Sequence, residues 1–404
     1  MARILIAVFG SAGDVHPFLA LGRALRQRGH DVRLQTNPAF QRHVAEAGLE
    51  FVGVGTADEF ESALHDPRLW DPAQAASFMM HEVLPPLIGP MAQFVEEHHL
   101  PGQTVVVAST LAAGTIAAAD WCGLPCVFTH LAPASLPSSR RPPRLAGVPG
   151  WLPRFAYPLI WRVADSVFDR GLAGPINALR AQRGLKPVRR LFTRYLLRTP
   201  ALRLGLFPAW FAPNPGDWPQ PTELTGFVFQ DHEHGATMQP ASDGTGVAPN
   251  RPADSHPREP QHVRDEATGY VSSNGSYRTI DPILGNDLGT WLINAQHAPG
   301  GPPIVVTMGT ANRFGAPIYQ AAIEAAGRLQ RHVLVLTKYA QDLPKELPAH
   351  ARHERYVPFR AVLPHASVLI HHGGVGTLAQ ALYAGIPQVI VPLAHDQFDN
   401  AKRV

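Results

Sequence analysis

The stretch His371-His372-Gly373-Gly374-Val375-Gly376-Thr377 lies near the C-terminal end of the chain. An apolar segment, 366–370, precedes it, and a helical pattern, 378–384, follows it and ends at Gly385-Ile386-Pro387. This order predicts a strand, a glycine-rich turn and a short helix. Such a turn leaves backbone N–H groups unsatisfied at the helix N-terminus, where they bind anions, and His372 and Thr377 can add two donors. The stretch alone leaves two interpretations open, a phosphate site and an ordinary tight turn of an α/β protein.

A second loop with functional side chains follows the first strand of the chain. An apolar run at 3–9 is followed by Gly10-Ser11-Ala12-Gly13-Asp14-Val15-His16-Pro17, a helical pattern and a further strand at 31–36. This is a βαβ unit whose loop lies at the carboxyl end of a strand, where open α/β sheets bind ligands. The loop lacks the spacing GxGxxG, so it does not predict a dinucleotide site.

Strands and helices alternate through most of the chain, which predicts two α/β domains with doubly wound parallel sheets. The first domain spans 1–230 and the second 288–404. The expected strands of the first domain include 49–54, 104–108, 126–129, 202–207 and 226–229. Those of the second include 303–307, 332–337, 366–370 and 389–392, with a short strand and loop at 355–359. Between the domains, 231–287 is rich in polar residues, Pro and Gly and lacks periodic apolar positions, so we expect a disordered insertion.

Composition excludes several classes of function. The chain has 404 residues, 45% hydrophobic and 17% charged, with a formal net charge of +3, which fits a globular protein. No basic tract is dense enough to predict nucleic-acid binding. The histidines of the insertion (His232, His234, His256 and His262) are irregularly spaced, so we expect no metal site and no cofactor. Two cysteines, no signal-peptide pattern and no bilayer-length apolar run predict a cytoplasmic protein.

The composition of segment 131–172 differs from that of the preceding residues. A loop rich in Pro and Arg leads into an aromatic stretch at 151–161. This stretch can line an apolar acceptor pocket, touch a membrane surface peripherally, or form a buried helix beside a flexible loop, and the sequence leaves all three open.

Three separate blocks resemble the GT-B glycosyltransferases that use nucleotide sugars, in the family 1 and family 28 group. The blocks are the loop 10–17, then Trp210, Asp217-Trp218-Pro219 and Thr225-Gly226-Phe227, and finally the C-terminal set Tyr356-Val357-Pro358, 371–377, Gly385-Ile386-Pro387-Gln388, His395-Asp396-Gln397 and Asn400. The chain is most similar to the bacterial branch that includes rhamnosyltransferases of glycolipid synthesis and sterol-type glucosyltransferases. The resemblance covers about 3–230 and 288–404 and implies two Rossmann-like domains that face each other across a cleft.

The resemblance also implies roles for individual residues. The donor diphosphate would be held by His372, Gly373, Gly374, Gly376 and Thr377, with Gly309 and Thr310 approaching from the turn Met308-Gly309-Thr310. Tyr356 and Val357 would neighbour the nucleobase, and Gln380 stands where many relatives have a Glu that contacts ribose, which leaves UDP and dTDP both open. Asp396 and Gln397 would bind hydroxyls of the donor sugar. Asp14 occupies the position where many relatives have the catalytic His.

The implied reaction is attack of an acceptor hydroxyl on the anomeric carbon as the nucleoside diphosphate leaves. It needs a base on the acceptor side and donors opposite for the charge of the leaving group. Asp14 and His16 are the candidate catalytic residues, although Asp14 can instead cap the helix that it precedes. We expect an inverting, metal-independent hexosyltransferase that uses a UDP- or dTDP-sugar and a small apolar acceptor such as a lipid, a sterol or a polyketide-like compound.

Two departures from the family pattern support an alternative. The first is the long polar insertion. The second is that the family continues beyond the block formed here by Asp396, Gln397 and Asn400, whereas only Ala401-Lys402-Arg403-Val404 follow in this sequence. The second domain is therefore expected to be incomplete. The alternative is a truncated, non-catalytic relative that at most binds nucleotide sugar.

Overall fold

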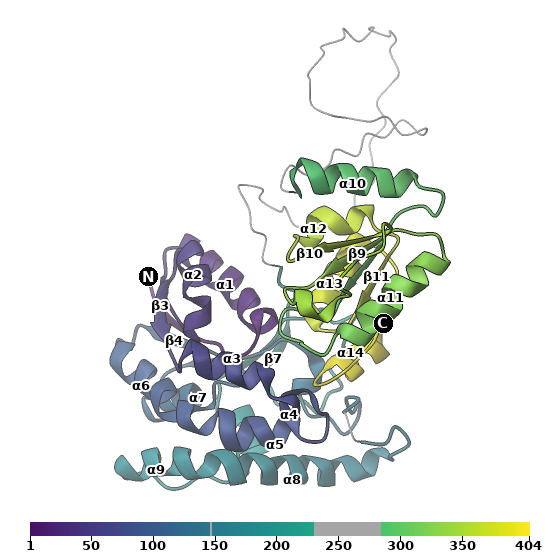
Figure 1. The fold of residues 1–404 in the computed structure, drawn as a ribbon. Coiled ribbons are helices and arrows are strands. Elements are labelled where there is room, and N and C mark those ends of the chain that lie inside the picture. Colours follow the sequence, from purple (N-terminus) through teal and green to yellow (C-terminus); the bar gives the residue numbers. More distant parts are fainter. Residues whose placement is uncertain (146–147, 230–283) are drawn as a thin grey trace, which may run out of the picture.

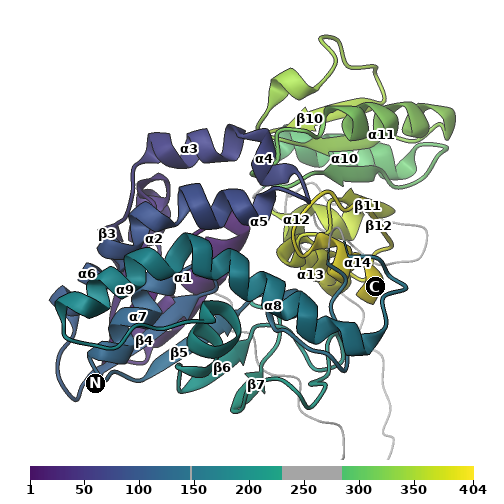
Figure 2. The same cartoon turned by 90° about the horizontal axis from the view of Figure 1, so that it is seen from below.

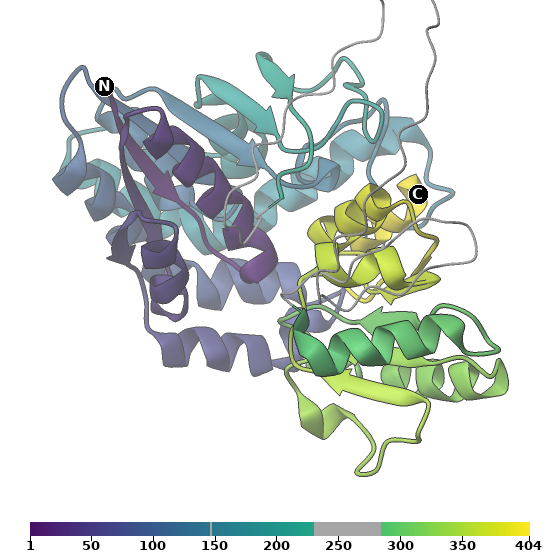
Figure 3. The ribbon, with the colours of Figure 1, turned by 90° about the horizontal axis from the view of Figure 1, so that it is seen from above.

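The computed structural model describes residues 1–145, 148–229 and 284–404, which form two α/β domains (Figure 1). Seen from above, the second domain, green to yellow, lies beside the first, purple to teal (Figure 3). The predicted insertion lies outside the described residues except for its end, where helix α10 (Gly285–His297) already begins.

The first domain is built on a parallel sheet of seven strands in the order β3-β2-β1-β4-β5-β6-β7. Side chains alternate across this sheet: Ile4 and Ile6 of β1 join one hydrophobic cluster, and Leu5 and Ala7 join the other. Burial on both faces explains why these strands are continuous apolar runs in the sequence. The strands are β1 (Arg3–Ala7), β2 (Asp31–Thr36), β3 (Glu50–Gly53), β4 (Thr104–Ser109), β5 (Cys126–His130), β6 (Leu202–Gly205) and β7 (Thr222–Leu224).

Helices cover both faces of this sheet. They are α1 (Ala12–Gln27), α2 (Gln41–Glu46), α3 (Ala57–His65), α4 (Pro67–Trp70), α5 (Ala75–Phe78), α6 (Ile88–His98), α7 (Ala113–Trp121), α8 (Tyr157–Phe168) and α9 (Gly174–Gln182). A π-helical turn, Met79–Val83, follows α5. Viewed from below, α9 and α8 run end to end across the underside of the domain (Figure 2).

The second domain repeats the plan with five parallel strands in the order β10-β9-β8-β11-β12. These strands are β8 (Ile304–Thr307), β9 (Val333–Leu336), β10 (Ala351–Glu354), β11 (Val368–His371) and β12 (Gln388–Ile390). Its helices are α10, α11 (Ala316–Arg328), α12 (Phe359–Val362), α13 (Val375–Ala384) and α14 (Gln397–Arg403). Two doubly wound α/β domains that face a cleft are therefore present, and the predicted fold class is confirmed.

Two predicted strands are wrong. The segment 226–229 forms no strand, and β7 at Thr222–Leu224 pairs with β6 instead. Phe227 packs edge-on against Phe211, with ring centroids 5.3 Å apart, so ring contacts rather than a strand ladder bury this apolar run. The segment 355–359, predicted as a short strand and loop, contains no strand: 355–358 is a loop between β10 and α12 that lines the cavity, and Tyr356 is 60% exposed. None of the helices among the described residues is both long enough and apolar enough to cross a bilayer.

Candidate active site

A cavity of about 1570 Å³ lies between the two domains. It is lined by the loops that follow β1 and β4 in the first domain and β8 and β11 in the second. Strand β1 lies between β2 and β4, and β8 lies between β9 and β11, so the strand order reverses at each of these loops. Parallel sheets bind ligands at such points, beyond the carboxyl ends of their strands.

On the second domain, the His372 imidazole is wedged between two glycines. A Cβ atom on Gly309 would lie 2.8 Å from Cε1 of His372, and one on Gly374 would lie 2.5 Å from its Nε2. Burial lowers the pKa of His372 to about 3, so the ring is neutral. Its Nδ1 is buried and has no hydrogen-bond partner among the described residues, which leaves a polar atom for a ligand.

Helix α13 begins directly beside this ring. Gly374 is its N-cap, and Gly376 and Thr377 of its first turn line the cavity. The first N–H groups of a helix have no partner within the helix, and its dipole favours an anion there. Gly309 and Thr310 line the same cavity.

Gly373 differs from the other residues that were predicted to bind the donor diphosphate. It does not line the cavity, because its N–H donates to Nδ1 of the buried His371 at 3.1 Å, and Nε2 of His371 lies 2.9 Å from Oε1 of Gln388. Its φ of +91° favours glycine, and a Cβ atom added here would lie only 2.8 Å from the Ile390 side chain. Gly373 therefore shapes the turn, and we correct its predicted role as a phosphate donor.

The predicted nucleoside residues Tyr356, Val357 and Gln380 all line the cavity. The sequence did not single out Lys338 and Arg355, which line the same end of the cavity. Their positive charges favour an anionic ligand there, but isolated basic residues carry no pattern by which a sequence can reveal them.

The predicted sugar-binding residues Asp396 and Gln397 lie where α14 begins. Asn400 Nδ2 donates to Oδ2 of Asp396 at 2.7 Å and to the Gly373 carbonyl at 2.9 Å, which ties this loop to the glycine turn. Oε1 of Gln397 accepts the N–H groups of Leu393 and Ala394, so only its Nε2 group is left for a ligand. Burial raises the pKa of Asp396.

Asp14 faces this loop from the first domain. It stands at the third position of α1, after the N-cap Ser11, and its Oδ2 accepts the backbone N–H of Ser11 at 2.8 Å and its Oγ–H at 3.0 Å. Asp14 is thus part of a capping box rather than the N-cap itself. Burial raises the pKa of Asp14 to about 6, and the negative charge of Asp396 adds to this effect.

His16 also lines the cavity, and its ring centroid lies 5.8 Å from that of His43. The geometry therefore keeps both Asp14 and His16 as base candidates.

The first domain gives the cavity an apolar wall that the sequence did not reveal. The wall comes from α3, α4, α5 and the π-helical turn after α5, and includes Phe60, Leu64, Leu69, Trp70, Phe78, Met79 and Val83. The aromatic stretch 151–161, which we considered for this role, contributes no residue to the cavity. Its Trp161 is buried, and its Trp151 and Phe155 are exposed to solvent.

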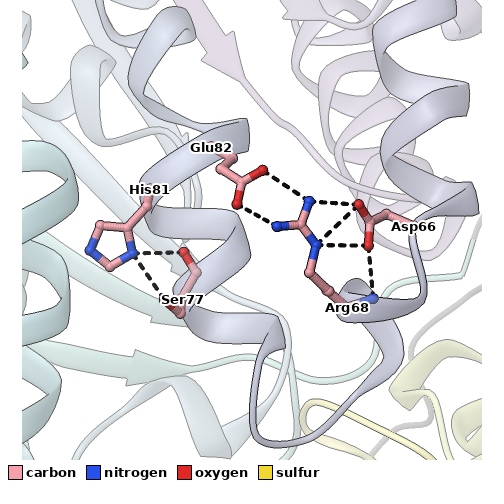
Figure 4. A network of polar contacts seen from close by, with 5 residues as sticks. All are labelled: Asp66, Arg68, Ser77, His81 and Glu82. Carbon is pink, nitrogen blue, oxygen red and sulfur yellow. Dashed lines mark hydrogen bonds and ion pairs between the residues drawn. The ribbon is translucent and has the colours of Figure 1, made fainter.

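An arginine fixes the short helices of this wall (Figure 4). The Arg68 guanidinium donates to both carboxylate oxygens of Glu82, at 2.6 and 2.9 Å, and to both of Asp66. It also lies 4.4 Å from the centroid of the Phe78 ring. Hydrogen bonding to Arg68 lowers the pKa of Asp66, which favours the charged carboxylate in this contact.

Contacts both at the cavity and outside it join the two domains. Asp399 of α14 accepts the backbone N–H of Arg144, from the first domain, at 2.8 Å, and its other oxygen accepts Nε of Arg403 at 2.7 Å. Trp70 and His395 meet edge to face with centroids 5.9 Å apart. The first domain thus contacts both ends of the short segment that carries Asp396 and Gln397.

Known families match both halves of the chain. The glycosyltransferase family 28 N-terminal domain matches residues 4–120, and the C-terminal domain described as erythromycin biosynthesis protein CIII-like matches residues 320–404. The O-mycaminosyltylonolide 6-deoxyallosyltransferase of Streptomyces fradiae is 27% identical over 98% of this chain and 81% of its own length. The chain belongs to the GT-B glycosyltransferases.

Other relatives of this GT-B glycosyltransferase have similar names. The vancomycin aglycone glucosyltransferase of Amycolatopsis orientalis is 26% identical over 100% of this chain and 83% of its own length. A sterol 3-beta-glucosyltransferase of Arabidopsis thaliana is 26% identical over 100% of this chain and 58% of its own length. The crystal structure of the glycosyltransferase of kitacinnamycin has a TM-score of 0.63 at 20% identity and covers 100% of this chain and 83% of that chain. The predicted family and the predicted enzyme class are confirmed.

Proposed function

We propose that this GT-B glycosyltransferase transfers a hexose from a UDP- or dTDP-sugar to a hydroxyl of a small apolar acceptor, with inversion and without an obligatory metal. One observation carries the proposal. The N-terminus of α13, with the neutral His372, and the Asp14 carboxylate line the same cavity from opposite domains.

The second domain supplies the groups that the leaving diphosphate needs. Its negative charge grows as the glycosidic bond to the donor breaks, and preorganised N–H groups at a helix N-terminus stabilise such charge. The first-turn amides of α13, the Thr377 hydroxyl and His372 are donors of this kind. A solved glycosyltransferase of this fold is complexed with thymidine diphosphate, which supports a nucleoside diphosphate as ligand.

Asp14 supplies the base on the acceptor side. With a pKa of about 6, its carboxylate is mostly ionised at neutral pH and is a stronger base than an ordinary aspartate. The acceptor hydroxyl gives its proton to Asp14 as its oxygen attacks the anomeric carbon, and the diphosphate leaves from the opposite face. A single displacement of this kind inverts the anomeric centre.

The apolar wall of α3 to α5 supports an apolar acceptor, because a pocket of this composition stabilises ligands by removing apolar surface from water. A relative named for a sterol agrees with this class. We place the reaction in the cytoplasm, which is supported by the free thiols Cys122 and Cys126.

The proposal is tested by incubating the protein with UDP- and dTDP-hexoses and a panel of apolar alcohols, with and without EDTA. We expect nucleoside diphosphate release that depends on an acceptor, persists in EDTA and gives a product of inverted configuration by NMR. Asp14→Asn should lower kcat/KM by about 10² to 10⁴ and leave nucleoside diphosphate affinity unchanged. Glu97→Gln, which changes an exposed carboxylate on α6, is the control. A retained configuration, or transfer only to free sugars, would contradict the proposal.

A further inference from the structure

Helix α8 lies on the underside of the first domain (Figure 2), and several of its apolar side chains are exposed to solvent. Its inner face is buried through Tyr157 and Trp161. On its outer face, Phe155 just before the helix is 85% exposed, Leu159 is 63% exposed and Val163 is 55% exposed. Residues four apart lie on the same side of a helix, so these three form one strip. A helix on the surface of a soluble domain normally turns polar residues outward, so this strip needs an explanation.

The strip does not serve the active site. None of these side chains lines the cavity between the domains. Trp151 lies four residues before Phe155 in the chain and is 80% exposed, so a second large ring near the start of α8 is open to solvent. Aromatic rings with one polar atom favour the boundary between water and lipid.

Arginines surround the strip. Arg154, Arg162 and Arg170 are exposed beside it at intervals of eight residues. Arg140 and Arg141 line a shallow hollow together with Arg154, Phe155 and Pro158. Basic and apolar groups are therefore adjacent on one surface.

The carboxylates near this surface are already bound. Asp165 is 3% exposed and pairs with Arg190 at 3.1 Å. Asp169 accepts the backbone N–H groups of Arg190 and Leu191. Asp217 accepts the Ser138 hydroxyl and the N–H groups of Ser139 and Arg140. The surface charge around the strip is therefore dominated by arginine.

We propose that the α8 face, meaning Trp151, Phe155, Leu159 and Val163 with their flanking arginines, docks on an anionic lipid surface. A helix that combines an apolar strip with arginine lies in the plane of the interface, with its apolar side chains among the acyl chains and its cations at the headgroups. The first domain would then rest on the lipid through α8. This inference does not depend on the identity of donor or acceptor.

The experiment is co-sedimentation of the full chain with phosphatidylcholine vesicles, with and without one-third phosphatidylglycerol. We expect binding that requires phosphatidylglycerol and weakens with salt. Arg154→Gln combined with Arg162→Gln should weaken it about 25-fold, at about fivefold for each arginine. Leu159→Glu should abolish it, whereas Leu329→Glu, at an exposed leucine of the second domain, should leave it unchanged.

Two results would overturn the proposal. One is sedimentation of Leu159→Glu to the same extent as the unaltered chain. The other is a dimer in light scattering that Leu159→Glu converts to a monomer, because the strip would then be an interface between copies. Donor hydrolysis in the absence of vesicles should be equal in all variants, so failure of this inference and failure of the proposed function are distinguishable.

Discussion

Replacing Asp14 with asparagine should make the protein more stable at pH 8 while it removes the proposed base. The asparagine side chain would keep an oxygen that accepts the N–H and hydroxyl of Ser11, so the capping contacts survive. What changes is the charge, which burial disfavours and which lies near Asp396.

The size of the effect follows from the pKa. Burial raises it from 3.8 to about 6, and because one pKa unit corresponds to about 1.36 kcal/mol, ionised Asp14 costs the folded state about 3 kcal/mol at pH 8. Asp14 is only half-buried, so this is an upper value. The cost shrinks as the pH falls through the folded pKa, and it disappears below about pH 3, where the carboxyl is protonated in both the folded and the unfolded chain. Asp14→Asn should therefore gain stability as the pH rises from 4 to above 6.

Urea unfolding at pH 4, 6 and 8, followed by circular dichroism, measures this gain as a shift of the midpoint. The assay needs no acceptor, so it stands apart from the identity of the substrate. Glu97→Gln should show no comparable pH-dependent gain. An Asp14→Asn protein that is less stable than the original at pH 8, or that gains equally at pH 4 and pH 8, would refute the idea that a buried charge is held at this position.

Two further predictions concern the walls of the site. Gly374→Ala should displace the His372 ring, because the new Cβ would lie 2.5 Å from Nε2, and titration calorimetry should show nucleoside diphosphate affinity reduced on the order of tenfold or more. Gly89→Ala, where a Cβ meets nothing within 4 Å, is the control, and equal losses in both would contradict the role of His372. Arg68→Gln should release Glu82 and raise the KM of the acceptor severalfold while the KM of the donor stays constant. An equal rise in both KM values would contradict the placement of the acceptor against the wall that Arg68 holds.

The sequence was most informative where the backbone itself makes the site. The glycine turn could be predicted because a strand, glycines and a helix in that order leave amides exposed whatever surrounds them. The sequence could not predict that Gly373 lies outside the cavity. Its N–H is taken by Nδ1 of His371, and the contact of His371 with Gln388 on the neighbouring strand sets the tautomer that leaves Nδ1 as an acceptor. Local pattern fixes the turn, but only the tertiary structure decides which amide remains available.

The acceptor wall shows the opposite case. Phe60, Leu69 and Phe78 lie on short helices, and an apolar side chain that faces a cavity has the same pattern as one that faces the core. The dense aromatic stretch at 151–161 was instead one candidate for the acceptor pocket, although some of its rings are buried in the core and others are exposed to solvent. Aromatic density indicates where apolar surface gathers, not which side of the domain receives it.

The hydrogen bond from the Arg144 amide to Asp399 has a consequence for engineering. Helix α14, which begins at Gln397 and directly follows Asp396, is held in part by the opposite domain. A chimaera that joined this second domain to the first domain of another enzyme would keep the proposed diphosphate site, whose residues all lie in the second domain. It would lose the hydrogen bond from the first domain to Asp399, beside the proposed sugar-binding residues, unless the graft also carried the loop that contains Arg144.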